Sequence, residues 1–388
     1  MRRNEILSQY GESVFTRISR LASNHDAIDL GQGYPGYPPP ADLRESLRNV
    51  PGDRSSHQYA PTTGTALLKE EISRFYESVQ DLKYDPTEEI TVTAGATEAL
   101  NSALMGLINP GDEVVVFEPV YDQYVPVARR AGAEVTVLAL DEKDFSLPLD
   151  RLRRVTTKET SVVILNNPHN PTGKVFERQS LQSLVSLAED RNLTLISDEV
   201  YEHLYFDDEK FVPLHSIEGA RNRSLCIGSA GKTFDATGWK VGWAIGPSEL
   251  TESLRLAHQF TTYCASAPLQ VALGNYLENL KPMDYLDRFR RRYSERRHLL
   301  RQGLKPTPFE VETGGGTYFL ISRFTGNEHR DDRSLVEWMV KEVGVAAIPL
   351  SSFYLKNSPD HPRVRFAFCK EKKHIRKAVR RLKDFFGD

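Results

Sequence analysis

Short apolar runs alternate with amphipathic segments over most of the first 282 residues. Short runs of three to five residues that are rich in apolar side chains predict buried strands, and the longer segments between them have helical spacing. The expected strands are residues 90–93, 113–117, 134–138, 161–165, 193–197 and 225–227, with helices at 67–79, 97–109 and 121–131. This alternation is typical of βαβ units, so we predict an α/β fold around a mostly parallel, doubly wound sheet.

The pattern changes after Pro282. A long basic helix at 285–301 precedes strands expected near 317–321, 345–348 and 364–367, and a last amphipathic helix carries Ile375, Val379, Leu382 and Phe386. We predict three regions: an N-terminal arm (1–44), a large domain (45–282) and a small α+β domain (283–388) against which the arm packs.

Composition excludes several classes of protein. The 388 residues are 39% apolar and carry a net charge of −3, which gives no electrostatic reason to expect nucleic acid or a membrane surface as partner. The basic helix at 285–301 is interpreted as a solvated face. Three widely spaced cysteines predict neither a disulfide framework nor a zinc site. With no apolar signal core at the N-terminus, we predict a cytoplasmic protein.

Four histidines show no metal-ligand spacing. His57, His169, His203 and His258 are therefore expected to be loop or surface residues, and no metal is predicted.

Lys232 is the most informative residue. It follows the short strand at 225–227 and precedes a glycine-containing turn, in the run S-A-G-K-T-F-D-A-T-G-W-K. A lysine so close to a sheet is expected where its amine forms a Schiff base with a carbonyl cofactor. Ser229 and Lys240 flank it, and a hydroxyl with a second cation suits a cofactor that carries a phosphate.

Other chemically capable residues also follow expected strands. Ala96 and Thr97 open a helix whose N–H groups face an anion, and Tyr121, Asn170 and Asp198 follow three further strands, with Tyr201 close behind Asp198. Taken singly, each has an ordinary interpretation, such as a helix cap, a turn residue or a packing ring. Because ligands bind at the carboxyl ends of parallel strands, we expect these residues to share one site.

The run G-Q-G-Y-P-G at 31–36 matches a dinucleotide-binding pattern literally. That site needs a helix opening at the third glycine, and Pro35, Pro38, Pro39 and Pro40 exclude one. We therefore do not predict an NAD-linked oxidoreductase.

At these residues the sequence resembles the fold-type I aminotransferases, which use pyridoxal 5'-phosphate, from S-V-F-T-R-I-S-R-L-A to V-R-F-A-F-C-K. The resemblance implies a large domain with a mostly parallel seven-stranded sheet, a smaller α+β domain, and a homodimer with shared active sites. It implies that Lys232 binds the cofactor and moves the substrate proton, and that Asp198 pairs with the pyridine nitrogen. The implied contacts to the ring come from Tyr201, Asn170 and Tyr121, and those to the phosphate come from Ala96, Thr97, Ser229, Lys240 and the partner's Tyr59.

Arg365 matches the family's arginine for the substrate α-carboxylate, and Arg363 two residues earlier is the competing candidate. The nearest branch holds kynurenine, glutamine and methionine aminotransferases, whose G-Q-G-F-P-D-F-P-P-P resembles residues 31–40, with Gly36 in place of aspartate. In that branch Gly33 would lie by the carboxylate and Phe15 over the substrate. Tyr263 and Cys264 align with an aromatic–histidine pair that reaches across the dimer.

This branch implies a large neutral or aromatic amino donor, namely methionine, glutamine, phenylalanine or tyrosine, with kynurenine as a further candidate. The nitrogen would pass to a 2-oxo acid in a ping-pong exchange. Three alternatives stay open: a cysteine-S-conjugate carbon–sulfur β-lyase, an N-succinyl-diaminopimelate aminotransferase, and a binding or regulatory protein without turnover.

Overall fold

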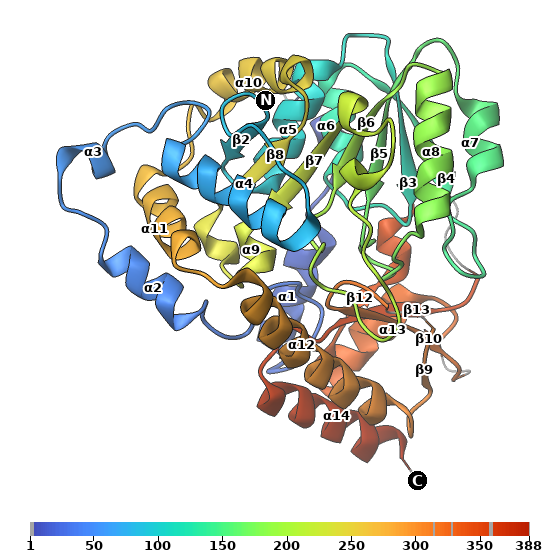
Figure 1. The fold of residues 1–388 in the computed structure, drawn as a ribbon. Helices are drawn as coiled ribbons and strands as arrows, with labels where there is room; N and C mark the ends of the chain where they lie inside the picture. The colour runs from blue at the N-terminus through green and yellow to red at the C-terminus, as the bar shows by residue number, and fades with distance from the viewer. Residues whose placement is uncertain (1–3, 313–314, 327–328, 357–359, 388) are drawn as a thin grey trace.

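The computed structural model describes residues 4–312, 315–326, 329–356 and 360–387. Figure 1 shows a large sheet with its helices in the upper part of the molecule and the C-terminal strands with α14 in the lower part. The long helix α12 (Pro282–Leu304) runs diagonally between these parts in the same view.

The large sheet has seven strands in the order β2-β8-β7-β6-β5-β3-β4. Every neighbouring pair is parallel except the two that involve β8, which is antiparallel to β2 and β7. The predicted mostly parallel α/β sheet is thereby confirmed. The strands are β2 (Ile90–Thr93), β3 (Glu113–Glu118), β4 (Glu134–Ala139), β5 (Thr160–Asn166), β6 (Thr194–Asp198), β7 (Ser224–Ser229) and β8 (Gly242–Ile245).

Alternate residues of the central strands enter two separate cores. Val115 of β3 packs in one cluster with Leu184 of α8 (Arg178–Asp190), whereas Val114 packs in the other with Leu104 of α5 (Ala96–Leu107) and Leu254. Because both faces are covered, these strands are apolar almost throughout, which made them visible in the sequence. The other helices of this part are α4 (Ala66–Gln80), α6 (Tyr124–Ala131), α7 (Leu149–Val155), α9 (Ala230–Thr233), α10 (Ser248–Thr261) and α11 (Ala267–Glu278).

Two expectations for this region are corrected. The helix expected at 121–131 begins at Tyr124, because the chain first turns over residues 122–123, so Tyr121 lies in the loop after β3. Strand β8 was not predicted. It passes so close to α5 that a Cβ on Gly242 would lie 2.5 Å from the amide nitrogen of Ala96.

The C-terminal part contains a four-stranded antiparallel sheet in the order β12-β13-β10-β9. The strand expected at 345–348 is two short strands, because residues 345–346 pair with the N-terminal β1 while residues 348–349 pair with β13. The elements are β9 (Phe309–Val311), β10 (Phe319–Phe324), β11 (Val345–Ala346), β12 (Ile348–Pro349), β13 (Arg363–Ala367), α13 (Asp332–Trp338) and α14 (Lys372–Phe386).

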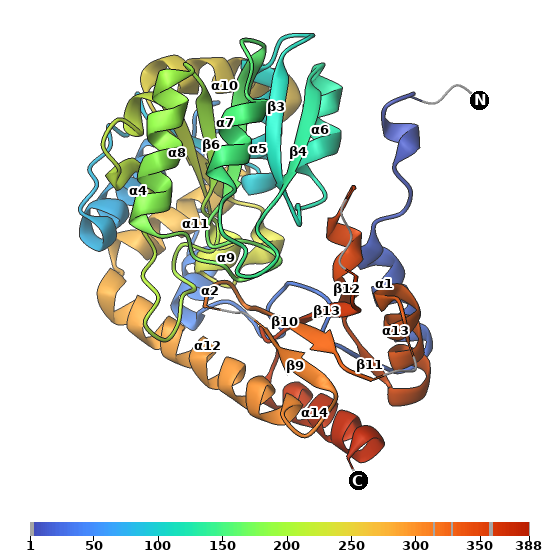
Figure 2. The same cartoon turned by 90° about the vertical axis from the view of Figure 1, so that its right-hand side faces the viewer.

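The N-terminal segment packs against this C-terminal part. Strand β1 (Ile28–Asp29) pairs in parallel with β11, and α1 (Val14–Asn24) buries Ile18. Figure 2 shows α1 close to β11 and α13. The chain then runs past Gly31 and Gly33 to α2 (Ala41–Arg48) and α3 (Arg54–His57). The domain boundaries given above stay a prediction.

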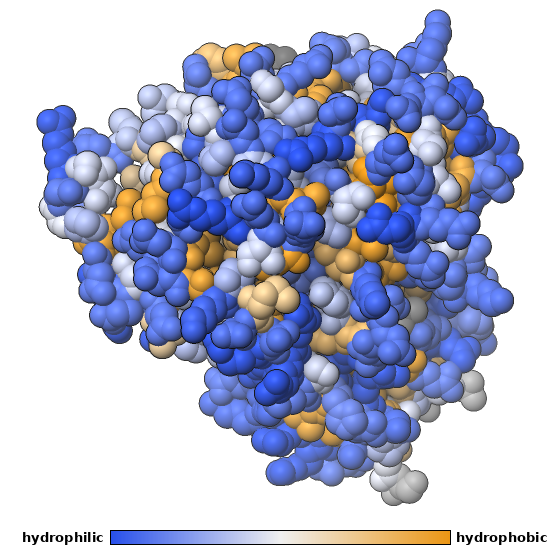
Figure 3. Space-filling view, in the orientation of Figure 1, coloured by the Kyte–Doolittle hydropathy of each residue, from blue (hydrophilic) through white to orange (hydrophobic). Residues whose placement is uncertain are grey.

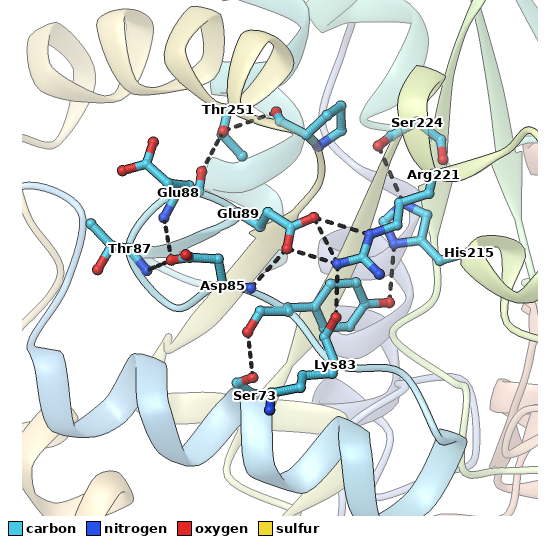
Figure 4. A network of polar contacts seen from close by, with 12 residues as sticks. Ser73, Lys83, Asp85, Thr87, Glu88, Glu89, His215, Arg221, Ser224 and Thr251 are labelled. Atoms are coloured by element: carbon cyan, nitrogen blue, oxygen red, sulfur yellow. Dashed lines mark hydrogen bonds and ion pairs between the residues drawn. The ribbon is translucent and has the colours of Figure 1, made fainter.

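A polar network holds the loop before β2 to the turn before β7 (Figure 4). The Glu89 carboxylate accepts hydrogen bonds from Arg221 Nη2 at 2.8 Å and from the Asp85 amide at 2.7 Å. The guanidinium of Arg221 also lies 5.0 Å from the ring centre of Tyr84, whose hydroxyl bonds His215 Nδ1 at 3.0 Å. This network fixes one end of the sheet at the edge opposite β4.

Within the described residues, no helix is long and apolar enough to cross a lipid bilayer. The cysteines Cys226, Cys264 and Cys369 are free thiols.

Candidate active site

A cavity of about 240 Å³ opens at the carboxyl ends of β5, β6 and β7. Asn166, Asp198 and Ser229 end these three strands and line it, and the N-terminal segment and β13 complete the wall. All the predicted site residues except Tyr59 and Tyr263 line this cavity: Phe15, Gly33, Ala96, Thr97, Tyr121, Asn170, Asp198, Tyr201, Ser229, Lys232, Lys240 and Arg365.

Lys232 lies on α9, a single helical turn capped by the Ser229 hydroxyl. Its Nζ donates hydrogen bonds to the Tyr318 hydroxyl at 2.8 Å and to the Gly33 carbonyl at 3.3 Å. Burial disfavours the ammonium form and lowers the pKa of Lys232 to about 8, against the opposing charge of Asp198. The amine is therefore neutral in a useful fraction of molecules near pH 8, as a base must be.

Asp198 ends β6 and is 5% exposed. Its Oδ2 accepts a hydrogen bond from the Tyr124 hydroxyl at 2.6 Å, while the Asn166 side chain donates to its backbone carbonyl at 2.8 Å. Burial raises the pKa of Asp198. A carboxylate at this depth in a cavity wall suits a cationic N–H partner, which would stabilise its charged form.

The start of α5 forms an anion cradle. Gly95, the residue before the helix, has φ +78° and provides no side-chain cap, so the positive helix terminus is open to a ligand. Lys240 Nζ lies 3.3 Å from Thr97 Oγ1, and a Cβ on Gly95 would come within 3.2 Å of that amine. Glycine at position 95 thus leaves room for the lysine beside the cradle.

Arg365 on β13 is 1% exposed and has no acidic partner among the described ion pairs. Its Nη1 donates to Asn170 Oδ1 at 2.7 Å and its Nη2 to the Gly31 carbonyl at 2.9 Å. Its Nε makes no hydrogen bond within the described part of the chain. Burial lowers the pKa of Arg365 to about 10, so the guanidinium stays charged at neutral pH.

Aromatic rings surround this guanidinium. Its carbon lies 3.8 Å from the ring centre of Phe319, 4.9 Å from that of Phe353 and 5.2 Å from that of Phe15. Arg363, the competing candidate, instead pairs with Glu312 at 2.7 Å. Of the two arginines, only Arg365 lines the cavity, and its charge is left for a ligand.

Tyr121 and Tyr201, the two tyrosines predicted to contact a cofactor ring, both line the cavity. Tyr201 is 5% exposed and meets the Tyr318 ring edge-on at 5.2 Å, and its burial raises the pKa of the hydroxyl. Tyr121 packs edge-on against Tyr124 at 5.6 Å. Both hydroxyls therefore stay protonated at neutral pH and can donate hydrogen bonds.

Sequence reasoning missed several cavity residues and their supports. Tyr124 contacts Asp198 across 74 positions of chain, and Tyr318 contacts Gly33 across 285. No local motif signals such distant contacts. Asn166 directly follows the expected strand at 161–165, and this place at a strand end was the signal that could have identified it.

Tyr59 and Tyr263 lie outside the cavity of the single chain. They are 82% and 48% exposed, with ring centres 5.4 Å apart. The expectation that these histidines are loop or surface residues is wrong for His258, which is buried within α10. His169 and His203 lie in loops as expected, although both are buried, and His57 is exposed. His258 bonds Glu98 at 2.9 Å and the Thr62 carbonyl at 2.8 Å. The described residues contain no group of side chains suited to a metal ion.

Comparison with known proteins agrees with this geometry. The profile of the aminotransferase class I and II family matches residues 25–382. A probable N-succinyldiaminopimelate aminotransferase of Mycobacterium tuberculosis is 39% identical over 387 residues, covering 97% of this chain and 96% of the relative. The methionine aminotransferase of Escherichia coli is 36% identical over 377 residues, covering 97% of each chain. The solved structure of the Mycobacterium tuberculosis N-succinyldiaminopimelate aminotransferase superposes with a TM-score of 0.94 at 37% identity, covering 99% of this chain and 100% of that one.

The chain belongs to the class I and II aminotransferases. Members of this family are enzymes that use pyridoxal 5'-phosphate, so the predicted reaction class and cofactor are confirmed. The solved relatives share the fold-type I architecture, and the predicted fold is confirmed with them.

Proposed function

We propose that this aminotransferase takes its amino group from a large neutral amino acid, such as methionine, glutamine, phenylalanine or tyrosine, with kynurenine as a further candidate. The nitrogen then passes to a 2-oxo acid in a ping-pong exchange. The observation that carries this proposal is the charge of the cavity. Among the described lining residues the cations are Lys232, Lys240 and Arg365.

Each of these cations has a task in the proposed reaction. Lys232 serves the proton transfer, Lys240 lies beside the anion cradle of α5, and Arg365 grips the α-carboxylate. Among the described lining residues no further cation is left for a second carboxylate on the substrate, whereas Phe15, Tyr121 and Phe319 supply apolar surface. A neutral side chain therefore fits this wall better than an acidic one.

The cavity suits pyridoxal 5'-phosphate in each of its parts. When bound, the cofactor supplies an electron sink that makes the Cα–H bond of an amino acid acidic. The open start of α5 with Ser229 and Lys240 would hold the phosphate, with Ala96 and Thr97 providing backbone N–H groups. Asp198 would accept a hydrogen bond from the pyridinium nitrogen, and that contact would keep the carboxylate ionised despite its burial.

This chain's own residues would carry out the proton transfer. The neutral amine of Lys232 would take the proton from the substrate Cα and hold it for return during the transfer, while the bound cofactor would supply the electron sink. Arg365, with Gly33 beside it, fixes the substrate carboxylate so that Cα lies within reach of that amine. Tyr201 and Asn170 would donate to the phenolic oxygen of the cofactor, and Tyr121 would cover its ring.

We further propose a homodimer in which Tyr59 of one subunit completes the phosphate site of the other. Supporting this, Tyr59 and Tyr263 are exposed next to each other, and Leu256 and Phe260 of α10 are 65% and 84% exposed. Figure 3 shows further apolar side chains at the surface over α11, toward α3.

Sedimentation equilibrium gives the oligomeric state. In a mixture of Tyr59→Phe and Lys232→Ala proteins, activity above that of either variant alone would support shared sites.

A donor panel with the holoenzyme tests the substrate proposal. We expect the cofactor absorbance to change fastest with methionine or an aromatic donor, and Lys232→Ala to show no turnover while remaining folded. N-succinyl-diaminopimelate is the second candidate, because it is the substrate in the name of the relative at 39% identity. Preference for it or for aspartate over every neutral donor would contradict the proposal. Pyruvate, ammonia and thiol from a cysteine conjugate would reveal β-lyase activity.

A further inference from the structure

We propose that Tyr318 is a positioning residue for the proton transfer: its hydroxyl holds the free amine of Lys232 so that the nitrogen lone pair faces the substrate. This inference rests on the proposed role of Lys232 as the base. It concerns a tyrosine that lies behind the cavity wall, since Tyr318 is fully buried and does not line the cavity.

The direction of each hydrogen bond follows from the chemistry of the partners. The Tyr318 hydroxyl contacts the Gly33 carbonyl, which can only accept, so the single phenolic hydrogen is committed there. The Tyr318 oxygen must therefore accept from Lys232 Nζ, 2.8 Å away. The Gly33 carbonyl is a second acceptor for that amine, at 3.3 Å.

These contacts determine the orientation of the neutral amine. A neutral lysine nitrogen has four tetrahedral positions, filled by Cε, two hydrogens and the lone pair. With Cε fixed by α9 and both hydrogens directed to Tyr318 and Gly33, the lone pair takes the remaining position. The bond to Tyr318 points behind the cavity wall, so the lone pair is left for the cavity side. After the Cα proton arrives, the two existing hydrogen bonds persist and the third hydrogen is the one that was moved.

The ring of Tyr318 is held firmly enough for this task. It stacks on Tyr293 with ring centres 6.0 Å apart and planes 21° from parallel. Phe319 and Tyr201 meet it edge-on at 4.8 Å and 5.2 Å. Burial raises the pKa of Tyr318 well above its usual value, so the phenol stays protonated and does not itself take the substrate proton.

Several charged or titratable groups face Lys232. Asp198 and Cys369 favour its ammonium form, while Arg365 and Lys240 oppose it. Tyr318 adds an acceptor without a charge. Removing its hydroxyl removes two hydrogen bonds, the one accepted from Lys232 and the one donated to the Gly33 carbonyl, and changes no net charge. Tyr318→Phe therefore perturbs the amine without changing the charges around it.

The matched control is Tyr37→Phe. Tyr37 belongs to the same aromatic cluster, 6.4 Å from Tyr293, and its hydroxyl is buried without a hydrogen-bond partner among the described atoms. The same chemical change is thus made in the same aromatic cluster, at a hydroxyl that does not bond Lys232. Thermal melting of both variants checks that each is folded.

The first readout is the half reaction of the holoenzyme with methionine, monitored through the absorbance of the cofactor. The rate is measured with normal and with Cα-deuterated methionine. Loss of one hydrogen bond to the amine should slow this step in Tyr318→Phe by roughly tenfold, since such a bond is worth about 1–1.5 kcal/mol. The deuterium isotope effect should rise, because Cα–H cleavage becomes more rate-limiting. Tyr37→Phe should match the wild type. An unchanged rate and isotope effect in Tyr318→Phe would overturn the proposal.

The second readout does not need activity. In the cofactor-free protein, the pH dependence of Lys232 labelling by trinitrobenzenesulfonate, quantified by peptide mass spectrometry, reports the pKa of the amine. The wild-type midpoint should lie near pH 8, matching the lowered pKa of Lys232. The Phe variant should shift it down by roughly one unit, because the ammonium loses an acceptor. An unshifted midpoint would argue that Tyr318 does not hold the amine.

The two readouts separate the two proposals. If no donor transaminates, the proposed function fails, yet the labelling shift still tests the contact between Tyr318 and Lys232. If the wild type transaminates but the Phe variant behaves like it, only the role of Tyr318 fails. Should Tyr318→Phe not fold, 3-fluorotyrosine at position 318 keeps the hydroxyl as a weaker acceptor. It should shift the midpoint in the same direction by less, and an unshifted midpoint would count against the proposal.

Discussion

Glu202 lies just beyond β6 with its carboxylate 1% exposed, and its ionisation should weaken the folded state. It accepts hydrogen bonds from the Tyr76 hydroxyl at 2.7 Å and from Gln80 Nε2 at 2.5 Å. Burial, with the nearby charge of Glu199, raises the pKa of Glu202 from 4.5 to about 8. At neutral pH the folded protein therefore holds a proton here that the unfolded chain has lost.

The sign and size of the effect follow from proton linkage. Between pH 4.5 and 8 the folded state binds the extra proton, so this group lowers the free energy of unfolding as pH rises. In the middle of this window, each rise of one pH unit lowers the free energy of unfolding by about 1.4 kcal/mol. Glutamine has the shape of the protonated acid and cannot ionise. We therefore compare the free energy of unfolding of Glu202→Gln with that of the wild type at each pH. We expect this difference to shift in favour of the variant by about 2.5 kcal/mol from pH 5 to pH 7.

Urea unfolding at a series of pH values and a constant protein concentration measures this difference. Glu310→Gln on β9 is the control, because Glu310 is an exposed glutamate in a surface ion pair with Arg323. It should show little pH dependence relative to the wild type. A Glu202→Gln difference that stays flat from pH 5 to pH 7 would refute the reasoning, because the carboxyl would then titrate alike in both states.

Three further predictions concern the site and the sheet edge. Arg365→Lys should raise KM for amino donors roughly 30-fold by losing about 2 kcal/mol of bidentate contact, measured in steady state, whereas Arg363→Lys should change it little. Asp198→Asn should slow the half reaction about 100-fold, because it loses a charged hydrogen bond worth about 2–3 kcal/mol. Stopped-flow absorbance measures this rate, and a wild-type rate would contradict the prediction. Arg221→Met should lower the free energy of unfolding by about 1 kcal/mol in urea, since it removes the partly exposed pair with Glu89.

Much of the fold was visible in the sequence because the buried parallel strands are almost wholly apolar. Strand β2 occupies the four residues expected. Strands β3 to β6 differ from expectation by one residue at one or both ends, and β7 begins one residue earlier and ends two residues later than expected. Strand β8 was missed because its short run, G-W-A-I, follows a glycine-containing turn and not a long helix, so it does not continue the alternation of strands and helices. The split of 345–348 depends on pairing with β1 more than 300 residues earlier, which no local pattern encodes.

The site was predictable to the extent that its residues stand at strand ends. Asp198 and Ser229 end their strands, so the topology of a parallel sheet alone gathers them at one edge. The residues that hold these site side chains in place were not predictable in this way. Tyr124 and Tyr318 act through side-chain contacts with residues distant in the chain, and a tyrosine near an apolar segment is indistinguishable from a packing residue by sequence.

The short stretch from Gly31 to Gly33 contacts two of the charged side chains of the site, Arg365 and Lys232. The carbonyl of Gly31 accepts from Arg365, and that of Gly33 accepts from Lys232 and Tyr318. In the proposed reaction, a mutation that shifts this stretch would alter carboxylate affinity together with the basicity and orientation of the lysine. Selection for a new substrate would then change the cavity elsewhere, because this backbone would couple binding to reactivity.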